Sequence, residues 1–590
     1  MSAIPIPAPT LVALMALAVG LTACGPQTTP RPDPALPTST PLDPPWFEDV
    51  TDARGLAFHH VAGTRYFMPD QVGSGIAILD FDNDGLLDLY LVQLGGPDSP
   101  ARNSLWRQRQ DGTFEDVSAG SGLDITGLGM GAFAADLNND GWTDLVVTEY
   151  GGVRVFQNLG NGRFQEVTAE SGLDHPGWAA PAAFLDFDRD GRLDVVIGNY
   201  LDYDPTQVCH DSHGRQDFCA PHAFPPTLTR LWRNTTSTPG ATPTFEDHTV
   251  AAGLAAHPGA ALGLLAADLD GDGWPDIFCA DDGRPNRLFI NRRDGTFREE
   301  AVPRGLALNA MGRPAADMGV AWADVDGDGR PDLFVTHLAE EFHSLFRQDA
   351  PGLFLDAVAQ AGLQQQAWRG TGFGTVLADF DLDGAPDLAI ANGLVRRATP
   401  GQTPVLPGVP EWWARYAQRP QLFANDGRGR FRDVSEAQPS FTRWAMVGRS
   451  LAVADLDNDG APDLVLAGTA GPVRLFRNIA PRRGRWVLLR LIDPAVGGRD
   501  AIGAQATVVA GSRRFIAVLQ PATSYLSSHD PRLHFGLGPV TAIDRVEVRW
   551  PDGTVESFSG IPLDRLTTLP RGSGRPQAME AIGSNPSIDD

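Results

Sequence analysis

The chain has 590 residues, of which 42% are hydrophobic and 20% charged, and its formal net charge is −26. This composition is that of a folded protein, and the length exceeds that of one ordinary domain. The negative charge argues against a nucleic-acid-binding protein, which needs a basic surface, and favours a protein that holds cations. The 65 glycines and 48 prolines predict many turns and therefore many short strands.

The N-terminal end predicts export. Residues 11–21, LVALMALAVGL, are too short to span a bilayer as a stable helix, and LTAC then ends at Cys24. This ending resembles the lipobox of bacterial lipoproteins, although no Lys or Arg precedes the apolar run. The resemblance implies that residues 1–24 are a signal peptide with a lipidated Cys24, and that this lipid is the only membrane attachment of a periplasmic or cell-surface protein. An ordinary cleaved signal peptide is the alternative, and the Pro-rich residues 25–45 predict an extended tether.

Two further cysteines suggest oxidation after export. Cys209 and Cys219 flank a short polar loop, CHDSHGRQDFC, and an oxidising compartment favours a disulfide between them. A metal site that adds His210 or His213 is the alternative, but a CxxC spacing is missing. Cys279 falls in a predicted strand and is expected to be a buried free thiol.

An Asp-rich motif of nine residues, first seen as DFDNDGLLD, occurs seven times. Positions 1, 3, 5 and 9 are Asp in every copy except for Asn138 at position 3 of the second copy, and position 6 is always Gly. The candidate ligands are, copy by copy, Asp80, Asp82, Asp84 and Asp88; Asp136, Asn138, Asp140 and Asp144; Asp186, Asp188, Asp190 and Asp194; Asp268, Asp270, Asp272 and Asp276; Asp324, Asp326, Asp328 and Asp332; Asp379, Asp381, Asp383 and Asp387; and Asp455, Asp457, Asp459 and Asp463.

This spacing fits a loop that binds a hard divalent cation. Ca²⁺ takes about six to eight oxygen ligands, and glycine permits the sharp turn that such a loop needs. Four neighbouring carboxylates repel each other unless a cation neutralises them. Turn formation explains one Asp and one Gly in each copy, but not four spaced acids. The sequence therefore predicts up to seven Ca²⁺ ions, with Mg²⁺ less suited to dense carboxylate cages and the Asn138 loop the weakest.

The repeats predict an all-β fold. Each Asp-rich loop joins two apolar strands, and a strand of the Phe-x-Asp-Val type follows later, so that each repeat carries about four short strands. That number favours a β-propeller blade over a sandwich. The seventh repeat lacks its last strand, and residues 46–51 provide a spare copy that would close the ring and remove exposed sheet edges. We predict a seven-bladed propeller over residues 46–480.

The C-terminal part predicts a second β-domain. RVEVRW alternates in polarity, PDG is a hairpin turn, and TVESF follows, which indicates a small β-sandwich or barrel over residues 485–570. Residues 571–590 are polar and are expected to form a disordered tail.

Two sets of motifs resemble a known family. The Asp-rich loops and Phe-x-Asp-Val strands are similar to the FG-GAP/VCBS repeats of integrin α-subunit propellers, and most similar to bacterial relatives of cartilage acidic protein. RDAIGAQATVVAG (499–511), SYLSSHDPRLHFGLG (524–538) and DRVEVRWPDGTVESF (544–558) closely resemble the ASPIC/UnbV domain of those proteins. The resemblance implies an extracytoplasmic, calcium-binding propeller with a small β-domain.

The sequence predicts a binding protein and not an enzyme, because it has no G-x-S-x-G, P-loop or H-E-x-x-H motif. The expected role is a binding or adhesion module for a protein or polysaccharide, with no nucleic-acid partner. The alternatives are a glycan-acting hydrolase or lyase on a propeller scaffold and a purely structural envelope protein. Adjacent Ser527, Ser528 and His529 do not make a triad, since a triad is defined by geometry.

Two insertions, at 200–228 and 391–418, interrupt the repeats. Long loops on a rigid scaffold often carry binding residues. Trp412, Trp413 and Tyr416 in the second insertion could therefore stack on sugar rings or anchor a protein partner, or else pack onto the propeller as a cover.

Overall fold

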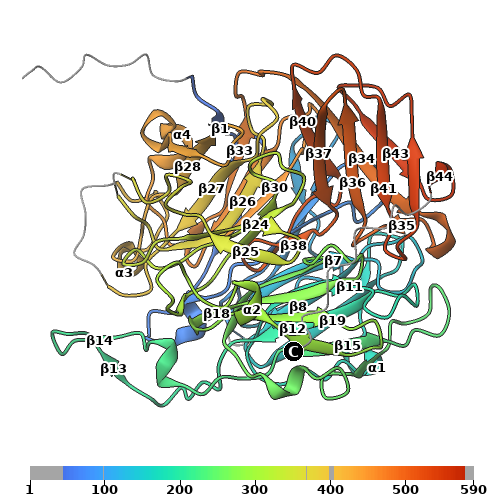
Figure 1. Ribbon diagram of the computed structural model, residues 1–590. Coiled ribbons are helices and arrows are strands. Elements are labelled where there is room, and N and C mark those ends of the chain that lie inside the picture. The colour runs from blue at the N-terminus through green and yellow to red at the C-terminus, as the bar shows by residue number, and fades with distance from the viewer. Residues whose placement is uncertain (1–43, 97–98, 367, 398–403, 578–590) are drawn as a thin grey trace, which may run out of the picture. The chain divides into compact units, whose positions relative to one another are not determined.

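The computed structural model describes residues 44–96, 99–366, 368–397 and 404–577. The predicted signal peptide, Cys24, most of the tether and the last 13 residues lie outside the described residues. Within the described ranges, no helix is both long enough and apolar enough to cross a membrane. The described chain consists of many short strands and one-turn helices (Figure 1).

The repeats form seven antiparallel four-strand units in the described residues, one for each Asp-rich loop (Figure 1). The first three units are β3 (Ile76–Leu79), β4 (Asp88–Leu91), β5 (Ser104–Gln108) and β6 (Phe114–Asp116); β7 (Gly129–Ala135), β8 (Asp144–Glu149), β9 (Gly152–Asn158) and β10 (Phe164–Glu166); and β11 (Ala179–Leu185), β12 (Asp194–Asn199), β15 (Arg230–Asn234) and β16 (Phe245–Asp247).

The later units repeat the same order. They are β17 (Ala261–Ala267), β18 (Asp276–Arg284), β19 (Arg287–Asn291) and β20 (Phe297–Glu299); β22 (Val320–Ala323), β23 (Asp332–Val335), β24 (Ser344–Ala350) and β25 (Leu353–Asp356); β26 (Gly372–Ala378), β27 (Asp387–Asn392), β28 (Gln421–Asn425) and β29 (Phe431–Asp433); and β30 (Gly448–Ala454), β31 (Asp463–Gly468), β33 (Arg474–Asn478) and β1 (Phe47–Asp49). In each unit the Asp-rich loop connects the first strand to the second.

The units close into a ring. First strands of consecutive units contact each other from β3 through β7, β11, β17, β22, β26 and β30, and β30 contacts β3. The N-terminal strand β1 completes the last unit by pairing Phe47 with Asn478. These observations confirm the all-β propeller class and support the predicted seven-bladed closure by residues 46–51.

Small residues let the first strands approach one another. A Cβ on Gly75 of the first unit would lie 2.6 Å from the Gly131 Cα of the second, and one on Gly374 would lie 2.5 Å from the Leu451 nitrogen. The first strands are therefore rich in Gly and Ala, and β7, β11 and β17 are buried throughout.

Several short elements lie outside the four-strand units. These are the paired strands β2 (His59–His60) with β32 (Gly471–Pro472) and β13 (Cys209–His210) with β14 (Gln216–Asp217), the strand β21 (Ala315–Ala316), and the single turns α1 (Thr168–Ser171), α2 (Ala301–Arg304), α3 (Glu411–Ala414), α4 (Pro439–Thr442), η1 (Met68–Gln71), η2 (Pro221–Ala223), η3 (Leu254–Ala256), η4 (Ser435–Ala437) and η5 (Pro494–Val496).

The C-terminal part forms two sheets. One contains β34 (Arg485–Asp493), β35 (Arg499–Asp500), β40 (Leu533–Gly538) and β43 (Leu566–Pro570), and the other contains β36 (Gln505–Ala510), β37 (Arg513–Val518), β41 (Arg545–Arg549), β42 (Val555–Phe558) and β44 (Arg575–Gln577). The tail prediction was wrong at its start, because β44 pairs with β42 and the Gly572 nitrogen donates to Glu556 Oε1 at 2.8 Å. Gly572, at φ 83°, makes the turn that returns the chain to this edge.

The segment 520–530, which contains β38 (Ala522–Thr523) and β39 (Ser527–Ser528), contacts first strands of the ring all the way round. β39 pairs with β3, and Ser524 forms a bridge with Val320. Other hydrogen bonds reach β7, β11, β17, β26 and β30. The Ala132 nitrogen donates to Leu526 O, and Gln520 Nε2 donates to Phe184 O and Ala266 O. The Thr375 nitrogen donates to Ser524 Oγ, which itself donates to Leu451 O. One stretch of the C-terminal part therefore holds all seven units from inside the ring.

Candidate metal centres

The seven Asp-rich loops share one backbone conformation. Positions 4 and 6 have positive φ in every loop, for example Asn83 at 55° and Gly85 at 86°. Glycine and asparagine adopt this left-handed region at low cost, whereas Leu382 holds it in the sixth loop at 61°. The sequence pattern identified the glycine but missed position 4, which is Asn, Arg, Gly or Leu among the copies.

This turn places the position-1 carboxylate against the backbone of its own loop. The two carboxylate oxygens of Asp80 accept from the Asp84 and Gly85 nitrogens, each at 3.0 Å. Asp136, Asp186, Asp379 and Asp455 accept the same pair of bonds in their loops. The backbone therefore fixes where this carboxylate points.

The position-9 carboxylate begins the second strand of each unit and is buried. Asp88 Oδ1 accepts from the Gln108 nitrogen at 2.8 Å, and its Oδ2 accepts from the Phe81 nitrogen at 3.2 Å. Burial is the largest cause that raises the pKa of Asp88, to about 8, and that of Asp332, to about 7. Because burial disfavours the charged form, a cation beside these carboxylates would remove that penalty.

Position 3 completes a set of converging oxygens. In at least five loops, one oxygen from each of positions 1, 3 and 9 lies within 4.8 Å of the others. These sets are Asp80, Asp82 and Asp88; Asp186, Asp188 and Asp194; Asp268, Asp270 and Asp276; Asp324, Asp326 and Asp332; and Asp379, Asp381 and Asp387. The structure thus brings together three of the four ligands that the sequence predicts in each of these loops.

The same position carries an oxygen that lacks a protein partner. Oδ1 is buried without a hydrogen bond in Asp82, Asn138, Asp188, Asp381 and Asp457. A buried acceptor without a donor costs about 1–3 kcal/mol, and a cation beside this oxygen would supply the missing partner. Carboxylate and amide oxygens are the donors that Ca²⁺ and Mg²⁺ prefer, and the residues therefore fit such an ion.

The position-5 carboxylates are not part of the converging sets. Asp84 Oδ1 accepts from the Leu86 nitrogen at 2.9 Å, and its Oδ2 lies 3.2 Å from Arg107 Nη2. Its counterparts Asp140, Asp190, Asp272, Asp328, Asp383 and Asp459 accept from the backbone two residues later in the same way. Their predicted role as ligands stays a prediction.

The second loop differs in charge but keeps the oxygen. Asn138 Nδ2 donates to Asp140 Oδ2 at 3.0 Å, and this leaves Asn138 Oδ1 buried without a partner. Arg499 of the C-terminal part contacts Asn139 of the same loop. The site therefore has one carboxylate fewer than the other loops, which weakens its attraction for a divalent cation.

Asparagine and glutamine side chains connect each loop to the neighbouring unit. Asn158 Nδ2, at the end of β9, donates to Phe81 O in the preceding loop at 2.8 Å and to Thr143 O in its own loop at 3.1 Å. Asn234, Asn291, Gln348, Asn425 and Asn478 reach Leu137, Phe187, Leu269, Val325 and Phe380 in the same way. Gln108 Nε2 donates to Leu456 O at 3.0 Å and so joins the first unit to the seventh. The polar ending of each third strand was the sequence signal for these links.

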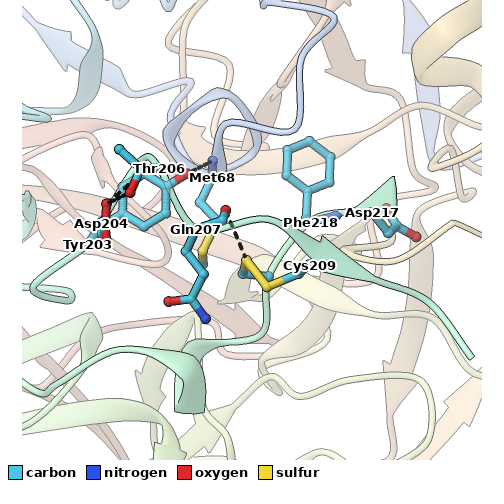
Figure 2. Close-up of a disulfide and its surroundings, with 9 residues drawn as sticks. Met68, Tyr203, Asp204, Thr206, Gln207, Cys209, Asp217 and Phe218 are labelled. Carbon is cyan, nitrogen blue, oxygen red and sulfur yellow. Dashed lines mark hydrogen bonds between the residues drawn. A yellow bond between two sulfur atoms is a disulfide. The ribbon is translucent and has the colours of Figure 1, made fainter. Parts of the chain in front are cut away.

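Several of the other predicted site residues are covered by protein. Cys209 and Cys219 form the predicted disulfide (Figure 2). Cys279 is buried and free. Trp413 and Tyr416 are buried beside Phe218, and the Tyr416 hydroxyl donates to Asp217 Oδ1 at 2.8 Å. These two side chains therefore pack between the two insertions, which agrees with the alternative prediction that they form a cover. Trp412 is partly exposed.

The Ser527–His529 stretch is part of the segment inside the ring. His529 Nδ1 accepts from the Val453 nitrogen at 3.2 Å, and Ser527 Oγ donates to Tyr525 O at 2.9 Å. All three side chains are buried, so the stretch has a packing role in this structure.

Family models match both parts of the chain. An FG-GAP-like repeat model matches residues 80–147, 136–197, 268–335 and 408–497, and the ASPIC and UnbV model matches residues 496–576. The chain belongs to the FG-GAP-like repeat proteins that end in an ASPIC and UnbV domain. These domains indicate an extracellular binding module of the propeller type.

The curated relatives are cartilage acidic proteins. The chain is 28% identical to cartilage acidic protein 1 of Xenopus tropicalis over 301 residues, which are 50% of this chain and 42% of the relative. It is 28% identical to the human protein over 291 residues, which are 48% of this chain and 39% of that protein. The match therefore spans less than half the length of either relative. The matched families and relatives are not known enzymes.

Solved structures match this chain at low sequence identity and low TM-score. A lectin of Agrocybe aegerita, described as recognising non-reducing terminal N-acetylglucosamine, is 17% identical, with a TM-score of 0.38 over 68% of this chain and 93% of the lectin.

Proposed function

We propose that the chain is an exported calcium-binding propeller that acts as a binding or adhesion module for a protein or polysaccharide. The observation that carries the proposal is the buried, unpartnered position-3 oxygen that recurs beside two further ligand oxygens. Ca²⁺ would neutralise the carboxylates of each loop. Because the strand-end amides tie each loop to its neighbour, an occupied loop would also stabilise the contact between two units.

Titration of the metal-free protein with calcium tests the proposal. Isothermal calorimetry and elemental analysis should find several Ca²⁺ ions per chain, and up to seven. Asp188→Asn removes a converging ligand, and Asp190→Asn removes the neighbouring position-5 carboxylate, which lies outside the converging set; both carboxylates also form an ion pair with Arg233. We expect the first variant to lose or weaken one site and the second to change affinity much less. A protein that binds no calcium in stoichiometric amount would refute the proposal.

The predicted lipid anchor is part of the same proposal. Cys24 would place the module at a membrane surface, with residues 25–45 as the tether. Expression of the full chain and of Cys24→Ser with a radiolabelled fatty acid, followed by membrane fractionation, measures the anchor. Label and membrane association should disappear in Cys24→Ser, and equal labelling of both chains would contradict the anchor.

A further inference from the structure

An arginine accompanies every position-3 aspartate of the Asp-rich loops. In the first, third, fifth and seventh units it lies on the third strand, directly before the Asn or Gln that links the units. These residues are Arg107, Arg233, Arg347 and Arg477. The fourth and sixth loops receive theirs from elsewhere, as Arg304 of α2 and Arg483 after β33. We call these six residues the loop arginines.

Each loop arginine contacts the same oxygen of its aspartate. In the third loop, Arg233 Nε lies 2.7 Å from Asp188 Oδ2, whereas Asp188 Oδ1 is buried without a hydrogen bond. The other pairs, all through Oδ2, are Arg107 with Asp82, Arg304 with Asp270, Arg347 with Asp326, Arg483 with Asp381 and Arg477 with Asp457. The arginine therefore does not use the inner oxygen, which stays available to a cation.

The same guanidinium also reaches the position-5 carboxylate in several loops. Arg233 Nη2 lies 3.4 Å from Asp190 Oδ2. Arg107, Arg477 and Arg483 contact Asp84, Asp459 and Asp383 in the same way. One positive charge thus lies beside two carboxylates that would otherwise repel each other in an empty loop.

The second loop shows what replaces the arginine where the negative charge is smaller. Its position 3 is Asn138, and Gln157 stands where the third-strand arginine stands in the third unit. Asn138 Nδ2 donates to Asp140 Oδ2 at 3.0 Å, so the amide joins positions 3 and 5 as the guanidinium does elsewhere. An arginine therefore accompanies position 3 where that residue is charged, which indicates that it balances this charge.

Such an arginine acts differently on the empty and the filled loop. In the empty loop it attracts the position-3 and position-5 carboxylates and offsets their repulsion. In the filled loop Ca²⁺ already neutralises these carboxylates, and the guanidinium and the ion repel each other. A group that stabilises the empty state more than the filled state lowers the affinity for the ligand. The charge around a calcium loop is one of the means by which its affinity is set.

We propose that the loop arginines are counter-charges that stabilise the empty loops and lower their calcium affinity below that of the four carboxylates alone. This inference rests on the proposed calcium-binding function and adds residues outside the loops that regulate it. The loops therefore fill at a higher free calcium concentration than their aspartates would set by themselves.

Arg233→Gln tests the proposal in the full chain. The EDTA-treated protein is transferred to buffers of set free calcium, and native mass spectrometry counts the ions bound per chain. We expect one ion to bind at about tenfold lower free calcium than in the wild type, because a positive charge no longer repels it. Arg233→Lys keeps the charge and should stay within about threefold of the wild type.

Arg230→Gln is the matched control. Arg230 lies on the same strand, is also partly exposed, and pairs with Asp247 Oδ2 at 2.9 Å, outside the Asp-rich loops. Its replacement should leave calcium binding unchanged. Arg107→Gln and Arg477→Gln repeat the test in the first and seventh loops, so the proposal stays testable even if the Arg233 variant does not fold.

Three outcomes would overturn the proposal. Weaker binding by Arg233→Gln would mean that the arginine orients the carboxylate for the ion, and unchanged binding would mean that its charge has no influence on the loop. Equal tightening in Arg233→Lys or Arg230→Gln would show that the charge beside Asp188 is not the cause. A wild type that binds calcium during any of these results leaves the proposed function standing, whereas a wild type that binds none refutes both.

Discussion

The Asp-rich loops and the segment 520–530 both hold neighbouring units of the ring together, but they do so in opposite ways. Each loop contacts its own unit and the parts of the chain next to it, through bonds such as that of Asn158 to Phe81. The segment contacts every unit at once and comes from a distant part of the chain. The loops are therefore redundant, because seven of them share one task, whereas the segment occurs once and has no substitute.

Removal of calcium affects all loops together and should therefore give the largest loss of stability. A site filled at about 100 times its dissociation constant adds about 2.7 kcal/mol to the free energy of unfolding, and several sites add up. We expect EDTA to lower the melting temperature by tens of degrees in differential scanning fluorimetry, and excess calcium to restore it. A melting curve that EDTA leaves unchanged would mean that the loops do not depend on metal.

The pH dependence of the metal-free chain should show why the loops need a cation. Burial raises the pKa of Asp88 to about 8 and that of Asp332 to about 7, above the value of 3.8 for an unperturbed Asp. A carboxyl group with a raised pKa contributes stability below its unfolded pKa, and this contribution is lost as the pH rises through the folded pKa.

Denaturant unfolding of the EDTA-treated chain should therefore show that these groups make it less stable as the pH rises from about 4 to about 8. Calcium should add more stability at the upper end of this range than at the lower end, because protonated carboxyl groups are poor ligands. Equal stabilisation by calcium at both ends would contradict this account of the loops.

A change within the segment should affect the whole ring through one residue. Tyr525 is fully buried, and its hydroxyl donates to Val72 O at 3.2 Å. Tyr525→Ala should lower the free energy of unfolding by about 3–5 kcal/mol, as for other large aromatic truncations in cores. Tyr525→Phe is the matched control, since it removes the hydroxyl and should cost about 1 kcal/mol. Equal losses for the two variants would show that packing of the ring does not matter here.

The two regions also differ in how far the sequence could predict them. The loop pattern is local, so the spacing of Asp82 and Asp88 around Gly85 was enough to predict convergence, whereas the links between units, such as that of Asn158, were not predicted. The role of Tyr525 depends on contacts with residues hundreds of positions earlier, such as Val72, and no short-range pattern encodes them. The start of β44 was missed for the same reason, because its partner strand decides its structure.

Loss of a single link between units should give the smallest effect, and it tests directly whether the loops are redundant. Asn158→Ala removes the bonds to Phe81 O and Thr143 O and leaves two carbonyls without this donor. We expect a loss of about 1–3 kcal/mol in the free energy of unfolding, measured in denaturant with calcium present. Gln157→Ala, one residue earlier and partly exposed, is the control and should change stability by less than about 0.5 kcal/mol. A loss as large as that of Tyr525→Ala would mean that the ring depends on each link as strongly as on the segment inside it, and that the loops are not redundant.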